Sequence, residues 1–256
     1  MSALTAKVLG CGGSNGVPEI GCQCYTCRSN NSKNKRLRAS LLLSTKTTNV
    51  LIDTTPDLRT QALENGVHKV DAVLYTHAHS DHINGIDDLK LLSKPRPIKA
   101  YADEYTLKEL TNKFNYIFNG STGGLYTPLL EGVKVTPYTP FSVGDMRIIP
   151  LLQHHHDISS LSFRVGDIAY STDFSSLPEQ TIELLQGVRY WFVDCLRYGW
   201  APTHQYLEKV MRYVYKVKPE KAFLVHMNHQ IEYEEMLKLL PHGWVMPAYD
   251  GLVVSA

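Results

Sequence analysis

A cluster of metal-binding residue types directly after a short apolar run is the feature that most constrains this chain. Residues 72–75 are apolar, and the next seven residues read Thr-His-Ala-His-Ser-Asp-His. Alternate side chains of an extended chain point the same way, which puts His77 and His79 on one side, and a following turn brings Asp81 and His82 to a neighbouring point. Imidazole and carboxylate suit Zn²⁺ or a similar metal, and four such ligands exceed the comfortable need of one tetrahedral ion. The cluster therefore predicts part of a site for two metals.

A site for two metals needs further ligands, and the sequence offers them just past other apolar runs. They are His154, His155, His156, Asp173 and His226. Taken alone, each is more often a capping or hydrogen-bonded residue than a ligand. Their shared place at the end of a predicted strand favours metal binding. The residues themselves do not decide which of the three consecutive histidines is the ligand.

Short apolar runs bounded by Gly, Pro or Asp recur along the chain and are typical of strands. The predicted strands are 6–9, 40–43, 49–52, 72–75, 99–101, 133–136, 146–152, 162–165, 168–170, 191–194, 222–225 and 252–254. Helical spacing of apolar residues covers 107–117, 178–185, 206–217 and 233–240. Groups of strands with helices between them indicate one layered α+β or α/β domain over residues 1–256, with helices outside two sheets. The small residues of 121–128 predict a loop.

Length and charge exclude some classes of protein. The chain has 256 residues, 43% of them hydrophobic, enough to build a core unaided. Its 26 basic and 25 acidic residues leave a net charge of +1. A chain with this charge has no overall positive potential that would attract nucleic acid. No secretory signal pattern opens the sequence, and no apolar run approaches the roughly 18 residues of a membrane span. We expect a cytoplasmic protein with no membrane segment.

The cysteines are informative through their placement. Cys22, Cys24 and Cys27 are clustered, whereas Cys11 and Cys195 stand alone. In a reducing compartment, clustered thiols are more often metal ligands or redox groups than disulfides. The two lone cysteines are predicted to be small core residues.

The histidines and aspartates resemble, in order and spacing, the signature of the metallo-β-lactamase superfamily along essentially the whole chain. The matching residues are Asp53, His77, His79, Asp81, His82, one histidine of 154–156, Asp173 and His226. The resemblance implies a four-layer αββα sandwich, in which two mixed sheets pack face to face with helices outside. The site would lie at one edge of the sandwich.

The resemblance also implies a role for each residue. The ligands of the first metal would be His77, His79 and one of the three consecutive histidines. The ligands of the second metal would be Asp81, His82 and His226. Asp173 would bridge the two metals, and Asp53 would orient ligands without binding metal. Counting back from the strand 162–165 favours His155, with its two neighbours as alternatives.

Three further features resemble the phosphoribosyl cyclic phosphate phosphodiesterase branch of the superfamily. Residues 10–18 form a Gly-rich turn after the first strand, without the glycine spacing of a dinucleotide site. The cysteine cluster together with His229 resembles a structural zinc site, which is closed to substrate. His204 resembles a histidine placed beside the substrate phosphate, although a surface histidine at a helix start is an almost equal alternative.

The function that the resemblance implies is hydrolysis of a small phosphodiester, such as a ribose cyclic phosphate. Two divalent cations, Zn²⁺ or Mn²⁺, would hold a bridging hydroxide as nucleophile, and a third site would hold a structural Zn²⁺. Asp81 would be catalytic as well as a ligand. His204 would hold the phosphate or protonate the departing alkoxide. The resemblance also favours a homodimer.

Three alternatives stay open. A tRNA 3′-end processing endonuclease shares the core signature, but it normally carries a basic arm that we do not find here. A thioester or lactam hydrolase would use the same metals on a carbonyl. A non-enzymatic scaffold with this fold would have lost a ligand, yet every ligand type has a candidate. If Tyr198 and Trp200 line the pocket, they would change the leaving group that it accepts.

Overall fold

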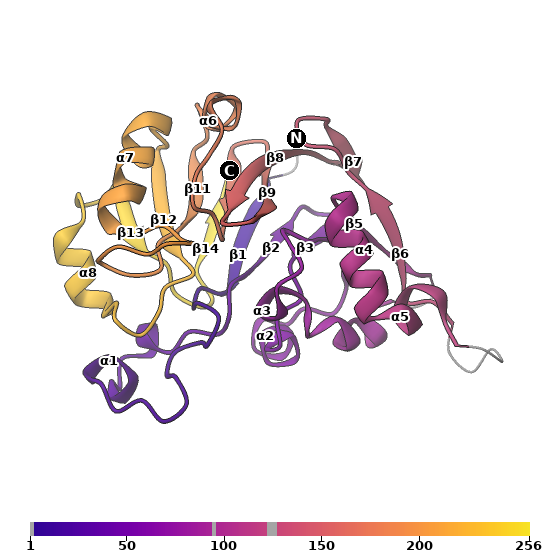
Figure 1. The fold of residues 1–256 in the computed structure, drawn as a ribbon, viewed down its shortest axis with the longest axis horizontal. Helices are drawn as coiled ribbons and strands as arrows, with labels where there is room; N and C mark the ends of the chain where they lie inside the picture. The colour runs from indigo at the N-terminus through magenta and orange to yellow at the C-terminus, as the bar shows by residue number, and fades with distance from the viewer. Residues whose placement is uncertain (1–2, 94–95, 122–126) are drawn as a thin grey trace.

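Some strands of this chain carry consecutive apolar residues, so both faces of their sheet have to be covered. In β2 (Ser40–Ser44), Leu41 and Leu43 belong to a core shared by both sheets, while Leu42 belongs to a second core under helices. The computed structural model, which describes residues 3–93, 96–121 and 127–256, accordingly has four layers (Figure 1). Most of the predicted loop 121–128 lies outside the described residues.

Two seven-stranded sheets form the inner layers. The first has the order β14 (Val253–Ser255), β1 (Thr5–Gly10), β2, β3 (Asn49–Ile52), β4 (Ala72–Leu74), β5 (Ile98–Ala102) and β6 (Leu130–Lys134). The second has the order β13 (Val245–Pro247), β12 (Lys221–Val225), β11 (Tyr190–Asp194), β10 (Ile168–Ser171), β9 (Ile158–Val165), β8 (Met146–His155) and β7 (Phe141–Val143). Each sheet is mixed: β3 to β6 are parallel, as are β10 to β13.

Helices cover the outer faces of the sheets (Figure 1). The first sheet carries α2 (Leu58–Asn65), α4 (Glu104–Lys113) and α5 (Asn115–Asn119), and the second carries α6 (Glu179–Leu185), α7 (Leu207–Val217) and α8 (Tyr233–Leu239). The short helices are α1 (Tyr25–Arg28), α3 (Ser80–Ile83) and the 3₁₀ helices η1 (Ser32–Asn34) and η2 (Ile86–Leu91). Among the described residues, no helix combines the length and apolar content needed to cross a bilayer.

The predicted αββα sandwich is confirmed, and each predicted strand overlaps an observed one. The prediction missed β7 and β13, which have three residues each, too few to show an alternating pattern. The predicted helix 107–117 is wrong as one element, because Phe114 leaves the helical region with φ −124° and ψ 45° and divides it into α4 and α5. The helix α2 was also missed, although Gly66, left-handed at φ 62°, ends it with an ordinary stop signal.

A buried arginine fastens the cysteine-bearing segment to the second sheet. Arg36 is only 2% exposed. Its guanidinium donates to the carbonyls of Lys33, Asn228 and Ile231 at 2.8–3.2 Å and to Oδ1 of Asn34 at 3.1 Å. These bonds join the loop before β2 to the loop after β12, so one side chain holds together two segments far apart in sequence.

We therefore expect Arg36→Met to lower the free energy of unfolding by about 3 kcal/mol or more, because several buried acceptors lose their donor at about 1–3 kcal/mol each. Urea unfolding monitored by circular dichroism measures this. Arg59→Met, at an exposed position on α2, is the control and should change stability by less than about 0.5 kcal/mol. Equal stabilities of the two variants would contradict the role of Arg36.

Candidate metal centre

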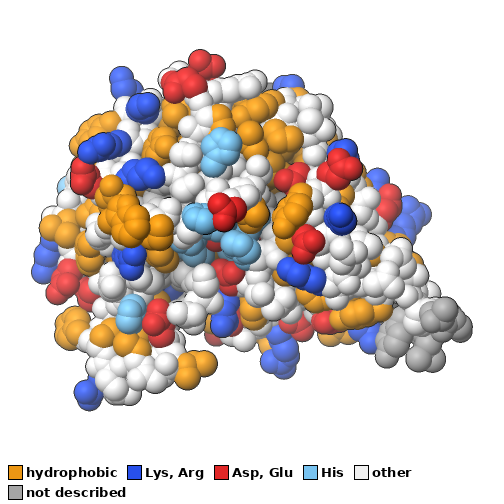
Figure 2. Space-filling model, viewed as in Figure 1, with side chains coloured by type: hydrophobic (Ala, Val, Ile, Leu, Met, Phe, Trp, Pro, Cys, Tyr) orange, Lys and Arg blue, Asp and Glu red, His pale blue; other side chains and the backbone are white. Residues whose placement is uncertain are grey.

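The candidate ligands lie where parallel strands of the two sheets end. Asp53 follows β3, Asp173 comes shortly after β10, and His226 follows β12. The histidine-rich motif begins after β4 and continues into α3, which carries Asp81 and His82. Carboxyl ends of parallel strands meet at one edge of a sheet, and here the edges of both sheets meet. Figure 2 shows histidine and acidic side chains gathered near the middle of this face.

Three of these residues have an uncommon backbone conformation. Asp53, Asp173 and His226 have φ values of 63°, 51° and 58°, in the left-handed region that residues with a Cβ avoid. Such a conformation costs about 1–3 kcal/mol per residue. It turns the chain sharply just past each strand. The side chains of Asp173 and His226 reach His82 and Asp81 across the centre, whereas Asp53 bonds within its own sheet. Six non-glycine residues of the described chain have a positive φ, and three of them thus help to build the centre.

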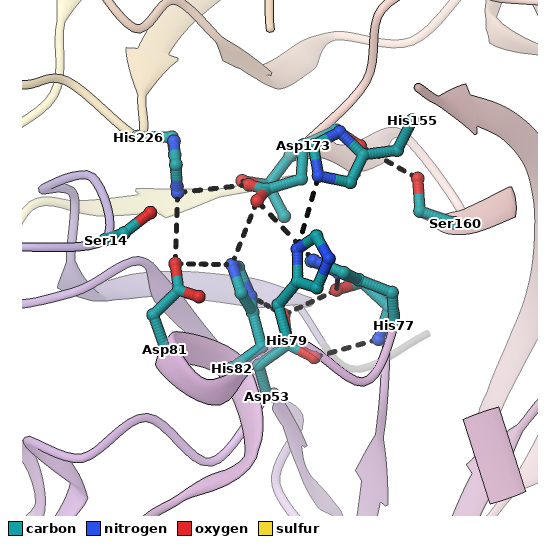
Figure 3. A network of polar contacts seen from close by, with 12 residues as sticks. Ser14, Asp53, His77, His79, Asp81, His82, His155, Ser160, Asp173 and His226 are labelled. Atoms are coloured by element: carbon teal, nitrogen blue, oxygen red, sulfur yellow. Dashed lines mark hydrogen bonds and ion pairs between the residues drawn. The ribbon is translucent and has the colours of Figure 1, made fainter. Parts of the chain in front are cut away.

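One group of candidate ligands, here called the first quartet, consists of His77, His79, His155 and Asp173. Their ligand atoms lie within 4.8 Å of one another. Nε2 of His155 is 3.3 Å from Nδ1 of His79, and Oδ2 of Asp173 is 3.6 Å from Nε2 of His77 (Figure 3). The four side chains therefore converge on one point.

The other group, the second quartet, consists of Asp81, His82, Asp173 and His226. Oδ2 of Asp173 lies 3.2 Å from Nε2 of His82, and its Oδ1 lies 3.2 Å from Nε2 of His226. Oδ2 of Asp81 is 3.3 Å and 3.5 Å from the same two nitrogens. Asp173 is common to both quartets, so its carboxylate lies between two converging ligand sets.

The chemistry of the quartets fits divalent cations. Nε2 of His77 and Nε2 of His82 are buried without a hydrogen-bond partner among the described residues. Burial, followed by the nearby His82, lowers the pKa of His77 well below its ordinary value, so that its ring stays neutral. A neutral ring with a free nitrogen is a lone-pair donor. Nitrogen and carboxylate donors suit Zn²⁺ or Mn²⁺, and buried polar atoms normally have a partner.

Asp53 holds two of the candidate ligands in orientation from behind. Its carboxylate accepts from the backbone N–H and the hydroxyl of Thr76, both at 2.8 Å, and from Nδ1 of His82 at 2.7 Å. The Thr76 hydroxyl, having donated to Asp53, accepts from Nδ1 of His77 at 2.9 Å. Both histidines therefore carry their proton on Nδ1 and turn Nε2 toward the quartets, an orienting arrangement common behind metal ligands.

Strand alternation separates the three consecutive histidines. β8 is longer than predicted and continues through His155, so neighbouring side chains point to opposite faces. His155 is 3% exposed and belongs to the first quartet, whereas His154 and His156 are exposed. Nδ1 of His155 donates to the carbonyl of Thr203 at 3.0 Å, which leaves Nε2 for the quartet.

His204 lies beside the quartets, and a carboxylate that the sequence did not single out holds it there. Its ring stacks on that of His226 at 4.8 Å, and its Nδ1 is 3.2 Å from Oδ2 of Asp194. Burial disfavours the charged ring, but the carboxylates of Asp194, Asp173 and Asp81 together outweigh burial and raise the pKa of His204 to about 9. Asp194 is fully buried, and its Oδ1 is 3.8 Å from Nδ1 of His226. Asp194 ends a predicted strand, as the other candidate ligands do, and that position is the signal that could have found it.

A separate group contains Cys22, Cys24, Cys27 and His229, whose ligand atoms also lie within 4.8 Å of one another. Nδ1 of His229 is 3.1 Å from Sγ of Cys22 and 3.8 Å from Sγ of Cys24. The backbone N–H of Cys27 lowers the pKa of Cys24. The five cysteines are all free of disulfides. Three thiols and one imidazole form the donor set of a closed zinc site.

The Gly-rich turn after β1 lines a cavity of 210 Å³ beside His204. Tyr198 and Trp200, in contrast, do not line it. Tyr198 packs against the core, and Trp200 is 70% exposed. The turn, and not these aromatic residues, forms the wall next to the metal centre.

Comparison with known proteins agrees with this fold and site. A family model described as the beta-lactamase superfamily domain matches residues 48–227, more than half of the chain. The chain therefore belongs to the metallo-β-lactamase superfamily. A crystal structure of a diphosphatase from the PhnP family is 37% identical, covers 99% of this chain and 97% of its own, and superposes with a TM-score of 0.92. The chain is thus similar over nearly its whole length to a member of the PhnP family.

Two curated relatives carry other names. An octanoyltransferase of Porphyromonas gingivalis (strain ATCC BAA-308 / W83) is 37% identical over 250 residues, or 96% of this chain. The chain spans only 50% of that protein's length. A ribonuclease Z of Methanopyrus kandleri is 29% identical over 138 residues, which are 51% of this chain and 44% of the relative. Neither match covers enough of the relative to transfer its activity.

We expect His155→Ala to lower the metal content of the purified protein by about one ion per chain, because the first quartet loses one of its four candidate ligands. The neighbouring His154 cannot take its place, since it points to the opposite face of the strand. His154→Ala, one residue away on the exposed face of the same strand, is the matched control and should keep the metal content of the unmodified protein. Plasma mass spectrometry of protein purified without added metal gives the count. If only the His154 variant lost metal, His154 and not His155 would be the ligand, and the prediction would be wrong.

Cys24→Ser should release about one zinc ion per chain and lower the melting temperature by more than about 5 °C, since 1 kcal/mol shifts Tm by roughly 2–4 °C in a domain of this size. Calorimetry and zinc analysis measure the two effects. Tyr25→Ser changes the neighbouring residue, which is 75% exposed, and should leave both quantities as they are. A Cys24 variant with unchanged zinc content would argue against a structural site.

Proposed function

We propose that the chain hydrolyses a phosphoester bond of a small phosphodiester, with two divalent cations held by the two quartets. The observation that carries this proposal is the placement of Asp173, whose carboxylate lies within 3.2–3.6 Å of ring nitrogens of both quartets. A carboxylate shared by two sets of ligands is typical of two-metal hydrolases that act on phosphate esters. We take the cations to be Zn²⁺ or Mn²⁺, and the cysteine group with His229 to hold a structural Zn²⁺.

When bound, the two cations supply Lewis acidity, which lowers the pKa of water and offsets negative charge on the phosphate oxygens. The protein's own groups prepare the site for them. Asp53 fixes the rings of His77 and His82, the latter directly and the former through Thr76. The carbonyl of Thr203 fixes His155. Because these ligands are already oriented, binding requires little rearrangement of the chain.

His204 is the candidate for proton transfer and phosphate binding. Asp194 occupies its Nδ1 and favours the charged ring, so Nε2 is left to face the substrate. A charged imidazole can hold a phosphate oxygen or donate a proton to a departing alkoxide. Which of these two roles His204 has depends on the side of the phosphate that the leaving group occupies.

Other features support a phosphodiester over the alternatives. The Gly-rich turn and the cysteine group match the phosphodiesterase branch in sequence, and the similar diphosphatase also acts at phosphorus. Cleavage of a diphosphate bond is therefore the second candidate. Processing of tRNA is less favoured, since the ribonuclease Z match covers 51% of this chain and the net charge is +1. Five free cysteines fit a reducing compartment such as the cytoplasm.

We expect metal-dependent hydrolysis of ribose cyclic phosphates or of bis-p-nitrophenyl phosphate, lost after chelation and restored by Zn²⁺ or Mn²⁺. Asp173→Asn should lower kcat/KM by about 10³-fold or more, because one carboxylate is withdrawn from both quartets at once. Asp167→Asn, exposed and remote from the quartets, is the control. Steady-state assays of loaded protein provide the comparison.

Two outcomes would overturn the proposal. One is full activity of the protein after exhaustive chelation. The other is the absence of turnover on both phosphodiesters with either metal. If a precursor tRNA were cleaved while the small esters were not, the ribonuclease alternative would replace it.

A further inference from the structure

Three buried polar side chains surround Asp173 from behind, and the proposed reaction leaves them unexplained. These residues, here called the polar triplet, are Gln153, Ser160 and Thr172, and all three are fully removed from solvent. Gln153 and Ser160 lie opposite each other on β8 and β9, and Thr172 lies between the end of β10 and Asp173. Residues of these types are mostly found at the surface, so their burial together beside the centre calls for a reason.

Thr172 binds the carboxylate of Asp173 directly. Its hydroxyl donates to Oδ1 at 2.7 Å, since a carboxylate only accepts hydrogen bonds. The other oxygen, Oδ2, lies 3.6 Å from Nε2 of His77 in the first quartet and 3.2 Å from Nε2 of His82 in the second. The hydroxyl therefore fixes the rotation of the carboxylate and leaves Oδ2 as the oxygen that lies near both quartets.

Gln153 and Ser160 hold the two peptide groups on either side of Asp173. Nε2 of Gln153 donates to the carbonyl of Thr172 at 2.9 Å and to the Ser160 hydroxyl at 3.1 Å. The amide has to face this way, because the carbonyl of Thr172 cannot donate. The Ser160 hydroxyl in turn donates to the carbonyl of Asp173 at 2.9 Å (Figure 3). Asp173 has a left-handed backbone, with φ 51°, and these bonds stabilise that strained conformation.

The other end of the Gln153 amide shows that it is more than a filler of the core. Its Oε1 is buried without a hydrogen-bond partner among the described residues. An unpaired buried acceptor is unfavourable, and an apolar side chain such as methionine would occupy the same space without one. What the glutamine supplies in return is its two N–H donors, and both bind the chain around Asp173.

The strand that carries Ser160 also contacts the opposite sheet. The backbone N–H of Leu161, the next residue, donates to the carbonyl of Thr76 at 2.9 Å. The hydroxyl of Thr76 is the group that joins Asp53 to the ring of His77. The chain around the shared carboxylate and the chain that orients the first quartet are thus held relative to each other.

We propose that the polar triplet positions the carboxylate of Asp173 so that one of its oxygens is shared by two metal ions. Thr172 selects that oxygen, and Gln153 with Ser160 holds the strained backbone that carries it. All three are positioning residues, because each acts through Asp173. The inference rests on the two-metal site of the proposed function and deepens it.

Manganese binding tests the role of the Thr172 hydroxyl. Thr172→Val removes the hydroxyl at nearly constant volume, whereas Thr172→Ser keeps it. Titration calorimetry of the full chain measures the affinity for Mn²⁺, and electron paramagnetic resonance measures the magnetic coupling between two bound Mn²⁺ ions. We expect Thr172→Val to weaken Mn²⁺ binding by about tenfold or more, as the loss of a group that orients a metal ligand predicts, and to alter the coupling. Thr172→Ser should restore both quantities.

Thr106→Val is the matched control. Thr106 is also fully buried, but it lies on α4, outside both quartets, and its hydroxyl has no hydrogen-bond partner among the described residues. Its replacement should leave the affinity and the coupling as they are. Gln153→Met keeps the size of the side chain and removes both donors, so it should weaken Mn²⁺ binding as Thr172→Val does.

The outcomes separate the positioning role from the function on which it rests. Unchanged affinity and coupling in Thr172→Val, or an equal loss in Thr172→Val and Thr172→Ser, overturns the inference and leaves the two-metal site standing. If Thr172→Val does not fold, unchanged Mn²⁺ binding in Gln153→Met overturns the inference instead. If the unmodified protein binds no coupled pair of Mn²⁺ ions, the inference and the proposed function both fail. If it binds the pair, the variants behave as expected and neither phosphodiester is hydrolysed, the inference stands and the proposed reaction fails.

Discussion

The buried carboxylate of Asp53 is the group on which the arrangement of the centre depends. It is completely removed from solvent, and burial raises its pKa, yet two donors from Thr76 and one from His82 surround its oxygens. A charge in that position is tolerated only because each oxygen is hydrogen-bonded. The same bonds tie the end of β3 to the segment after β4 and fix which nitrogen of each ring faces the quartets. Loss of this carboxylate would therefore disturb the sheet edge and the centre together.

Most of the fold could be predicted because its elements carry their own patterns. The apolar runs of β1 to β5 and of β8 to β12 are long enough to recognise, and the amphipathic α7 has a clear apolar face. Elements without such a pattern were missed. β7 and β13 are stabilised by a neighbouring strand, and the residues of α2 do not separate into two faces. Phe114 interrupts a continuous helical pattern, and its side chain packs against the core under the helices. Helix rules that use only the neighbouring residues do not predict such an interruption.

The centre was predictable where chemistry and spacing coincide. The motif from His77 to His82 brings several candidate ligands into one short segment, so local geometry alone places them close together. His155 was favoured by counting back from the strand 162–165, because the sequence placed the end of β8 three residues too early for strand alternation to separate the three histidines. Asp194 was missed because its importance comes from two histidines that only the packing of β11 against its neighbours brings near. The cavity likewise arises from three loops that are distant in sequence.

The left-handed backbones of Asp53, Asp173 and His226 have a consequence for how such a protein can change over time. Glycine adopts that conformation without strain, and asparagine tolerates it better than most residues, so replacements that ruin the centre can relax the chain at the same positions. Selection for stability alone would then favour replacement of the candidate ligands at these positions by other residues. Related proteins that are no longer selected for catalysis should therefore remain well folded but inactive. Their sequences would begin to diverge at these strained positions.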